Sequence, residues 1–186
     1  MSVEYTSIQT ARLALRPLSQ TDGTVLHHIY QSEGVLRYFP NPAPPDLDKV
    51  QRFITAQQAH WEKFGYGNWG ILPKGESDII GWAGLQYLPE LDETEVGFLL
   101  DNPWWGKGYA TEAAKASIKF GFEHCGLNHI IALVHPDNLA SRRVIEKSEM
   151  YYQDRLYLWG IELMRYRIEN RVNTMGDVAS TEVTQR

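Results

Sequence analysis

The sequence has only one cysteine, no long apolar run and no excess of basic residues. Cys125 is the single cysteine among 186 residues, which excludes an internal disulfide and a cysteine-based zinc site. We expect an inert core thiol in a reducing compartment. No apolar run approaches the roughly 18 residues that a membrane span needs, and the first ten residues lack the basic and apolar regions of a signal peptide.

The charge balance excludes a further class of partner. The formal net charge is −5, whereas a nucleic-acid surface needs clustered lysine and arginine. We therefore expect a cytoplasmic protein with neither a nucleic-acid nor a membrane partner. The composition, 43% hydrophobic and 22% charged, is that of an ordinary globular protein. No linker or repeat divides the chain, so we expect one domain over residues 1–170, followed by a disordered tail over 171–186.

Hydrophobic periodicity predicts a mixed α/β domain. The runs typical of strands are 11–18, 68–72, 79–87, 94–100, 130–134, 151–159 and 161–168. The runs typical of helices are 19–32, 46–64, 109–124 and 138–148. Short turns separate most neighbouring strands, which favours antiparallel pairing. The sequence thus predicts about seven strands in a mostly antiparallel sheet, flanked by about four helices.

A glycine-bearing turn joins one of these strands to the third helix. The segment 95–114 reads EVGFLLDNPWWGKGYATEAA. The first N–H groups of a helix lack partners within the helix, and its dipole adds positive potential there. Gly106 and Gly108 allow a close backbone approach and positive φ angles. These features favour a pyrophosphate cradle, although an ordinary strand-to-helix turn would also use such glycines. A P-loop and a dinucleotide loop fit less well, since Thr111 stands where a dinucleotide loop has its third glycine.

Two linked motifs resemble a known family. The run 104–113, WWGKGYATEA, resembles the coenzyme A loop of GNAT N-acetyltransferases, Gln/Arg-x-x-Gly-x-Gly/Ala, with Trp105, Gly108 and Ala110 in its three positions. The run 135–147, HPDNLASRRVIEK, resembles the Asn-x-x-Ser helix start of the RimJ/RimL-like branch, which modifies ribosomal proteins. Residues 35–39, VLRYF, are also similar to this branch. The motifs have the family's order and separation, and the resemblance covers about residues 8–168.

The resemblance implies a single-domain GNAT fold with a V-shaped opening between strands 94–100 and 130–134. It implies acetyl-CoA as the co-substrate and no metal. The coenzyme-binding residues that it implies are Phe98, Leu99, Leu100, Trp105, Gly106, Lys107, Gly108, Tyr109, Ala110, Asn138, Ser141 and Arg142. Pantetheine would contact the backbone at 98–100, the pyrophosphate the amides at 106–110, and the thioester end Asn138 and Ser141. Arg142 or Arg143 would reach a phosphate, unless both lie on a solvated helix face.

The implied chemistry needs a base. An alkyl ammonium has a pKa near 10, so the amine must lose a proton before it attacks the thioester carbonyl. Glu95 lies on the strand that leads into the opening and is the predicted base, directly or through water. A solvated strand edge is the alternative for Glu95. His135, which closes the next strand, is the rival base, or else a turn residue bonded to the backbone.

The chemistry also needs a proton donor for the departing thiolate. Many GNAT enzymes use a tyrosine seven residues after the motif asparagine, but this sequence has Ile145 there. Ser141 is the predicted donor in its place, although a helix cap or a coenzyme contact would also explain a serine. Tyr151 and Tyr152 are further candidates, from the last hairpin. Glu149 stands where the branch has a helix-ending glycine, so we expect the local turn to differ.

The resemblance implies an N-acetyltransferase that acts on a primary amine by direct attack, and three possibilities for its role remain open. The acceptor is a protein N-terminus in the first. It is a small amine in the second, such as a polyamine, an amino acid, an aminoglycoside or a toxin. The third is a non-catalytic acyl-CoA-binding regulatory module. The sequence is compatible with a monomer or a homodimer.

Overall fold

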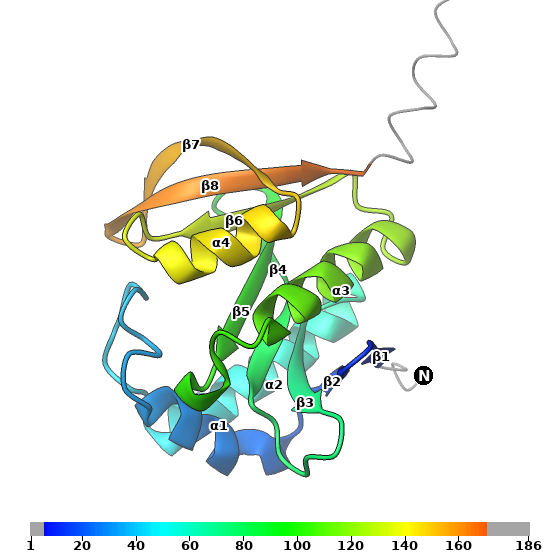
Figure 1. Cartoon of the computed structure of the whole chain (residues 1–186), viewed down its shortest axis with the longest axis vertical. Coiled ribbons are helices and arrows are strands. Elements are labelled where there is room, and N and C mark those ends of the chain that lie inside the picture. Colours follow the sequence, from blue (N-terminus) through cyan, green and yellow to red (C-terminus); the bar gives the residue numbers. More distant parts are fainter. Residues whose placement is uncertain (1–5, 171–186) are drawn as a thin grey trace, which may run out of the picture.

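The computed structural model describes residues 6–170 and forms one mixed α/β domain (Figure 1). The strands are β1 (Ile8–Gln9), β2 (Leu13–Pro17), β3 (Asn68–Pro73), β4 (Gly81–Leu88), β5 (Glu93–Leu100), β6 (His129–Val134), β7 (Tyr151–Leu158) and β8 (Ile161–Glu169). The helices are α1 (Gly23–Gln31), α2 (Leu47–Phe64), α3 (Tyr109–Glu123) and α4 (Leu139–Lys147), with short 3-10 turns at Gln20–Asp22 and Asn102–Trp104. The tail expected at 171–186 lies outside the described residues.

One sheet contains all eight described strands, in the order β1-β2-β3-β4-β5-β6-β8-β7. Every neighbouring pair is antiparallel except β5 and β6, which run parallel. The predicted fold class is therefore confirmed. The strand beyond the expected seven is β1, whose two residues pair with Ala14 and Leu15 and are too few to show a periodicity.

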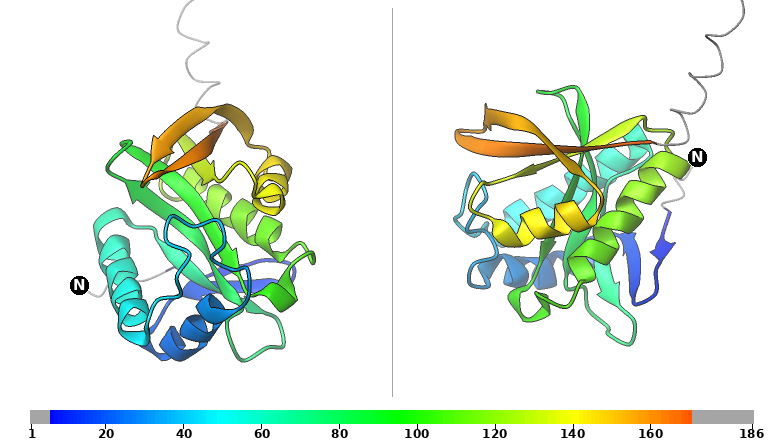
Figure 2. Two further views of the ribbon diagram at one scale, coloured as in Figure 1. Left: turned by 90° about the vertical axis from the view of Figure 1, so that its left-hand side faces the viewer. Right: turned by 45° about the horizontal axis from the view of Figure 1, so that its top comes forward.

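Helices cover both faces of the sheet (Figures 1 and 2). α3 and α4 lie on one face, and α1 and α2 lie on the other. The larger core cluster packs small residues of α3, such as Ala113 and Ala114, against Ala83 and Leu85 of β4. A second cluster joins α1 and α2 to Leu99 of β5 on the opposite face. None of the helices within residues 6–170 is both long and apolar enough to cross a membrane.

The parallel pair β5 and β6 separates almost at once. Glu95 and Ile131 are the one aligned pair between these strands, whereas β4 and β5 remain paired along their whole length. Beyond Glu95 the two strands diverge, so backbone groups that would pair inside a continuous sheet become available to a ligand. This separation is the V-shaped opening that the family resemblance implies.

The turn after α4 corrects one expectation. Glu149 has φ 65°, in the left-handed region that glycine adopts in related sequences. The prediction of a different turn was wrong, because this chain keeps the left-handed conformation with an L-residue. An L-residue in this region costs about 1–2 kcal/mol. A glycine at position 149 would avoid this cost.

Candidate active site

The coenzyme loop has the backbone geometry that its glycines predict. Gly106 has φ 74° and Gly108 has φ 81°, so both positive φ angles are confirmed. Gly108 is the N-cap of α3, and no side chain caps that end of the helix. Residues 105–108 are exposed, and a Cβ built on Gly106 would meet no atom within 4 Å. The first N–H groups of α3 can thus be reached by an anion.

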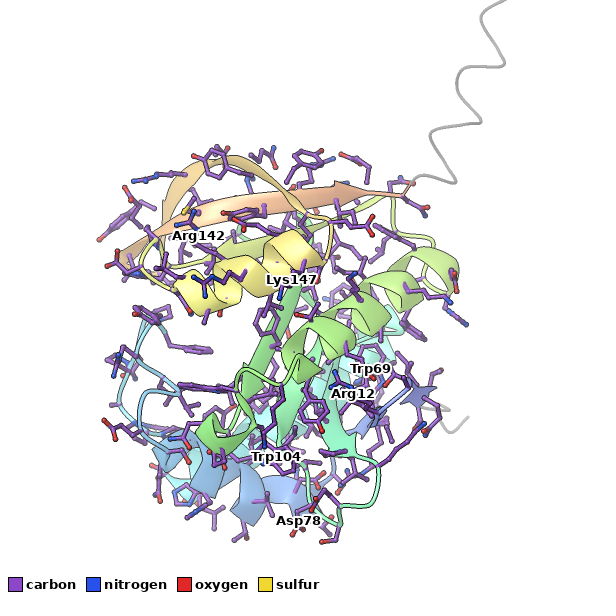
Figure 3. All side chains as sticks on the ribbon, viewed as in Figure 1. Arg12, Trp69, Asp78, Trp104, Arg142 and Lys147 are labelled. Carbon is purple, nitrogen blue, oxygen red and sulfur yellow. The ribbon has the colours of Figure 1, made fainter. Side chains whose placement is uncertain are left out.

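Arg12 clamps this loop from the far edge of the sheet, a role that sequence reasoning missed. Its Nε donates to Glu112 Oε2 at 2.7 Å, and its Nη1 donates to the Lys107 carbonyl oxygen at 2.9 Å. Thr10 donates to the other Glu112 oxygen at 2.6 Å, and the guanidinium stacks 4.6 Å from the Tyr109 ring centroid. Figure 3 shows Arg12 beside α3. About 100 residues separate these partners along the chain, so no local pattern predicts the contact.

Two tryptophans hold the loop on its other side. Trp105 Nε1 donates to the Leu100 carbonyl oxygen at 2.7 Å, and the ring lies beside Gly34 of the loop after α1. Lys107 extends its ammonium over the Trp104 ring, 4.6 Å from the centroid. Trp105 therefore fixes the end of β5, and the motif position that usually holds Gln or Arg acts here through the indole N–H.

A cleft opens between β5 and β6 and continues under α4. Its lining comprises Tyr38, Phe39, Pro40, Trp82, Glu95, Val96, Gly97, Phe98, Leu133, Val134, His135, Asn138, Ser141, Ile145, Trp159 and Leu163. The structure thus brings together Glu95, Phe98, Asn138 and Ser141 of the predicted site. The side chains of Leu99 and Leu100 are buried in the two core clusters instead. These two residues can contact a ligand through their backbone only.

Glu95 lies where the strands part. Its Oε1 accepts a hydrogen bond from the Leu133 backbone N–H at 3.2 Å. Leu133 lies two residues beyond Ile131, the residue of β6 that is aligned with Glu95. Burial raises the pKa of Glu95 to about 7, and the hydrogen bond from Leu133 acts in the opposite direction. A solvated strand edge would leave the carboxyl near 4.5. A carboxyl that titrates near neutral pH in a cleft has the property of a general base.

His135 is placed less well for that role. Its Nδ1 accepts the Asp137 backbone N–H at 3.2 Å, so the neutral ring carries its proton on Nε2 and has no free lone pair. The ring also packs against Tyr38, with 5.3 Å between centroids. This is the turn interaction that was the alternative for His135, and the geometry favours Glu95.

The start of α4 faces the same cleft. Asn138 is the N-cap, and its side-chain oxygen accepts the Ser141 backbone N–H at 3.1 Å. Ser141 is therefore the capped residue rather than the cap, and its side chain lines the cleft. Ile145 is buried in the cleft wall at the usual tyrosine position and offers no proton.

Other candidates lie elsewhere. Arg142 points from α4 toward β8 (Figure 3), where its Nε donates to Tyr166 Oη at 3.3 Å. Arg143 is exposed. Tyr151 and Tyr152 are exposed on β7, and neither belongs to the cleft lining, so the last hairpin does not bring them to the chemistry.

Burial raises the pKa of Cys125 to about 11, so this thiol stays protonated. Within residues 6–170 no group of His, Cys, Asp and Glu side chains has the arrangement of a metal site.

The described sheet parts between its one parallel pair and has a helix N-terminus at the opening, which is the arrangement that the GNAT resemblance implies. A family model described as the acetyltransferase (GNAT) domain matches residues 12–151. The chain belongs to the GNAT family and is an N-acetyltransferase.

Known relatives agree with this assignment. A Bacillus subtilis protein described as the uncharacterized N-acetyltransferase YoaA is 26% identical over 141 residues, 75% of this chain and 80% of the relative. The crystal structure of an acetyltransferase from Agrobacterium tumefaciens superposes with a TM-score of 0.78 at 29% identity, covering 88% of this chain and 94% of that one. RimL, a ribosomal-protein α-N-acetyltransferase solved with coenzyme A, shares the fold at a TM-score of 0.75 and 15% identity, with coverage of 88% and 98%.

Proposed function

We propose that this enzyme transfers the acetyl group of acetyl-CoA to a primary amine by direct attack of the amine, with Glu95 as the base. The observation that carries the proposal is the position of Glu95, a partly buried carboxyl whose pKa is raised to about 7, at the point where β5 and β6 part. The loop that favours pyrophosphate lies at the other end of β5. One strand therefore links an anion site to a base.

The residues fit the proposed co-substrate. The uncapped N-terminus of α3 and the exposed Gly106–Gly108 turn provide amide donors for a pyrophosphate, and the parted backbone of β5 provides partners for the pantetheine amides. The predicted contacts run from Trp105 through Ala110, and then from Asn138 to Ser141. Arg142 or the exposed Arg143 would add a positive charge near a phosphate.

The proposed reaction forms one bond and breaks another. Glu95 takes a proton from the ammonium, the neutral nitrogen attacks the thioester carbonyl, and the bond from carbon to sulfur breaks. The thiolate leaves with a proton from Ser141 or from water, the second proton of the attacking nitrogen restores that donor, and the amide product keeps the acetyl group. No covalent bond to the enzyme is needed, so a protein nucleophile has no role.

The acceptor is either a protein N-terminal amine, as the name of RimL states for that enzyme, or a small-molecule amine. Thiol release from acetyl-CoA, measured with a panel of amines and N-terminal peptides, tests the proposal. We expect release that depends on both substrates and rises with pH through about 7. Coenzyme binding without release from any amine would indicate a regulatory module instead.

A further inference from the structure

Two pockets meet beside Glu95, and Trp159 lies in the wall of both. One is the cleft between β5 and β6, and the other, of about 470 Å³, lies against α2 and β4. The residues that line both pockets are Phe39, Trp82, Glu95, Gly97 and Trp159. Three of these lie on β4 or β5, whereas Phe39 and Trp159 come from loops and are 38% and 44% exposed. The two loop aromatics therefore form the outer wall of the space beside Glu95.

The backbone of Trp159 is strained. Trp159 and Gly160 form the two-residue turn between β7 and β8, with φ angles of 52° and 83°. Two positive φ angles are typical of a type I′ hairpin turn, which favours asparagine, aspartate or glycine in its first position. An L-residue in the left-handed region costs about 1–2 kcal/mol, and a bulky aromatic residue is unusual there. Because strain of this kind concentrates at functional sites, a tryptophan at this position points to a function of its side chain.

A carboxylate from another hairpin holds the indole of Trp159. The indole Nε1 donates to Glu90 Oε1 at 3.2 Å. The backbone N–H of Glu90 and the Trp159 indole lower the pKa of the Glu90 carboxyl, so the acceptor is ionised. Glu90 lines neither pocket and lies in the turn between β4 and β5, just before the strand that carries Glu95. The bond thus ties the tip of one hairpin to the tip of the other.

Few charged groups face Glu95. Among the described residues, neither pocket lining includes lysine or arginine, and the other titratable groups in the two linings are Tyr30, Tyr38 and His135. Glu93 lies two residues before Glu95 on the same face of β5, and its carboxylate already contacts Arg165, Arg167 and His129. Burial is the largest influence on the pKa of Glu95, followed by the bond from Leu133. The access of water to this carboxyl therefore governs its basicity.

We propose that Trp159 is a positioning residue for the base: its indole, held by Glu90, closes the solvent side of the space beside the Glu95 carboxyl and keeps water from it. This inference rests on the proposed function, in which Glu95 is the base. In this role the indole contacts no reacting atom and acts through Glu95. A carboxyl that is shielded from water is a stronger base than a solvated one, so removal of the wall weakens the base.

The variant Trp159→Asn tests this role by NMR titration, without any reaction. Asparagine suits the first position of a type I′ turn, so the variant removes the ring and keeps the hairpin. In protein labelled with carboxyl-¹³C glutamate, the Glu95 signal is the one that Glu95→Gln lacks. We expect the titration midpoint of Glu95 to fall from about 7 in the wild type by at least about 1 pH unit in the variant, since water reaches the carboxylate. An unchanged midpoint would overturn the proposal.

Variants of Glu90 test whether its bond holds the indole. Glu90→Ala removes the acceptor and should lower the Glu95 midpoint in the same direction as Trp159→Asn. Glu90→Gln keeps an acceptor oxygen without the charge and should restore the wild-type midpoint, whereas an equal fall in both variants would assign the effect to charge and refute the bond.

The control for the hairpin is Tyr157→Phe. It removes the 2.7 Å bond from Tyr157 Oη to the Gly160 carbonyl oxygen in the same turn, but Tyr157 lies outside both linings. Its Glu95 midpoint should equal that of the wild type. A shift in this control would show that any change at the hairpin tip affects the carboxyl, and would overturn the role of the indole.

Steady-state kinetics separate this inference from the proposed function. The acid limb of kcat/KM, measured with an amine that the wild type accepts, reports the base of the free enzyme. In Trp159→Asn we expect this limb to move to lower pH by the same amount as the NMR midpoint. If the midpoint moves but the limb does not, or if no amine gives thiol release, the proposed function fails while the role of Trp159 stands. If the limb and the midpoint both stay in place, this inference alone fails. The melting temperature of each variant shows that it is folded.

Discussion

Replacing Glu95 with glutamine changes stability and activity in opposite directions. In the unfolded chain this carboxyl has a pKa near 4.5, and in the fold its pKa is about 7. Below pH 4.5 both states hold the proton. Between pH 4.5 and 7 the unfolded state ionises first, so the free energy of unfolding falls as pH rises, by about 3 kcal/mol in total. Glutamine does not ionise, so Glu95→Gln should escape this loss while Leu133 keeps its hydrogen-bond acceptor.

Urea unfolding of both proteins at pH 5 and pH 8 measures the effect. The stability of Glu95→Gln relative to the wild type should increase by about 2–3 kcal/mol between these pH values. At pH 8 the maximal rate of Glu95→Gln should be about 10²–10⁴-fold below that of the wild type, because the amine must then arrive already neutral. Glu62→Gln, at an exposed position, is the control and should change neither quantity. A relative stability that does not vary with pH, or a rate loss under threefold, would refute the reasoning.

Four further substitutions test the rest of the site and one turn. Gly108→Val should weaken acetyl-CoA binding by at least about tenfold in calorimetry, since valine disfavours φ 81°, and unchanged affinity would remove the cradle assignment. Arg12→Met should raise KM for acetyl-CoA by about tenfold and leave KM for the amine unchanged in steady-state assays, because the clamp on the loop is lost; the reverse pattern would contradict a role in the loop. If Ser141 donates the proton, Ser141→Ala should lower the maximal rate about a hundredfold with coenzyme affinity intact, whereas weaker binding alone would make it a coenzyme contact. Glu149→Gly should raise the free energy of unfolding by about 0.5–1 kcal/mol, and a decrease would show that the glutamate side chain outweighs the relief of its left-handed backbone.

The local features of the site could be predicted because they depend on neighbouring residues. Gly106 and Gly108 predict positive φ angles before a helix, and both angles are present. The cap at Asp46 and the apolar spacing of Val50 and Ile54 likewise predict α2, whose Lys49 N–H bonds Asp46. Glu149 is the exception, because a glutamate does not predict the left-handed conformation that this residue adopts.

Sequence alone determined the family, the order of the elements and the strand that carries Glu95. Only the tertiary structure decided what surrounds that carboxyl, because the burial that raises its pKa comes from several elements of the cleft, and its bond to Leu133 comes from a strand more than thirty residues further along the chain. The clamp from Arg12 to Glu112 also joins segments that are distant in sequence. Such contacts arise from the sheet order, and no local periodicity encodes which strand becomes the neighbour of which.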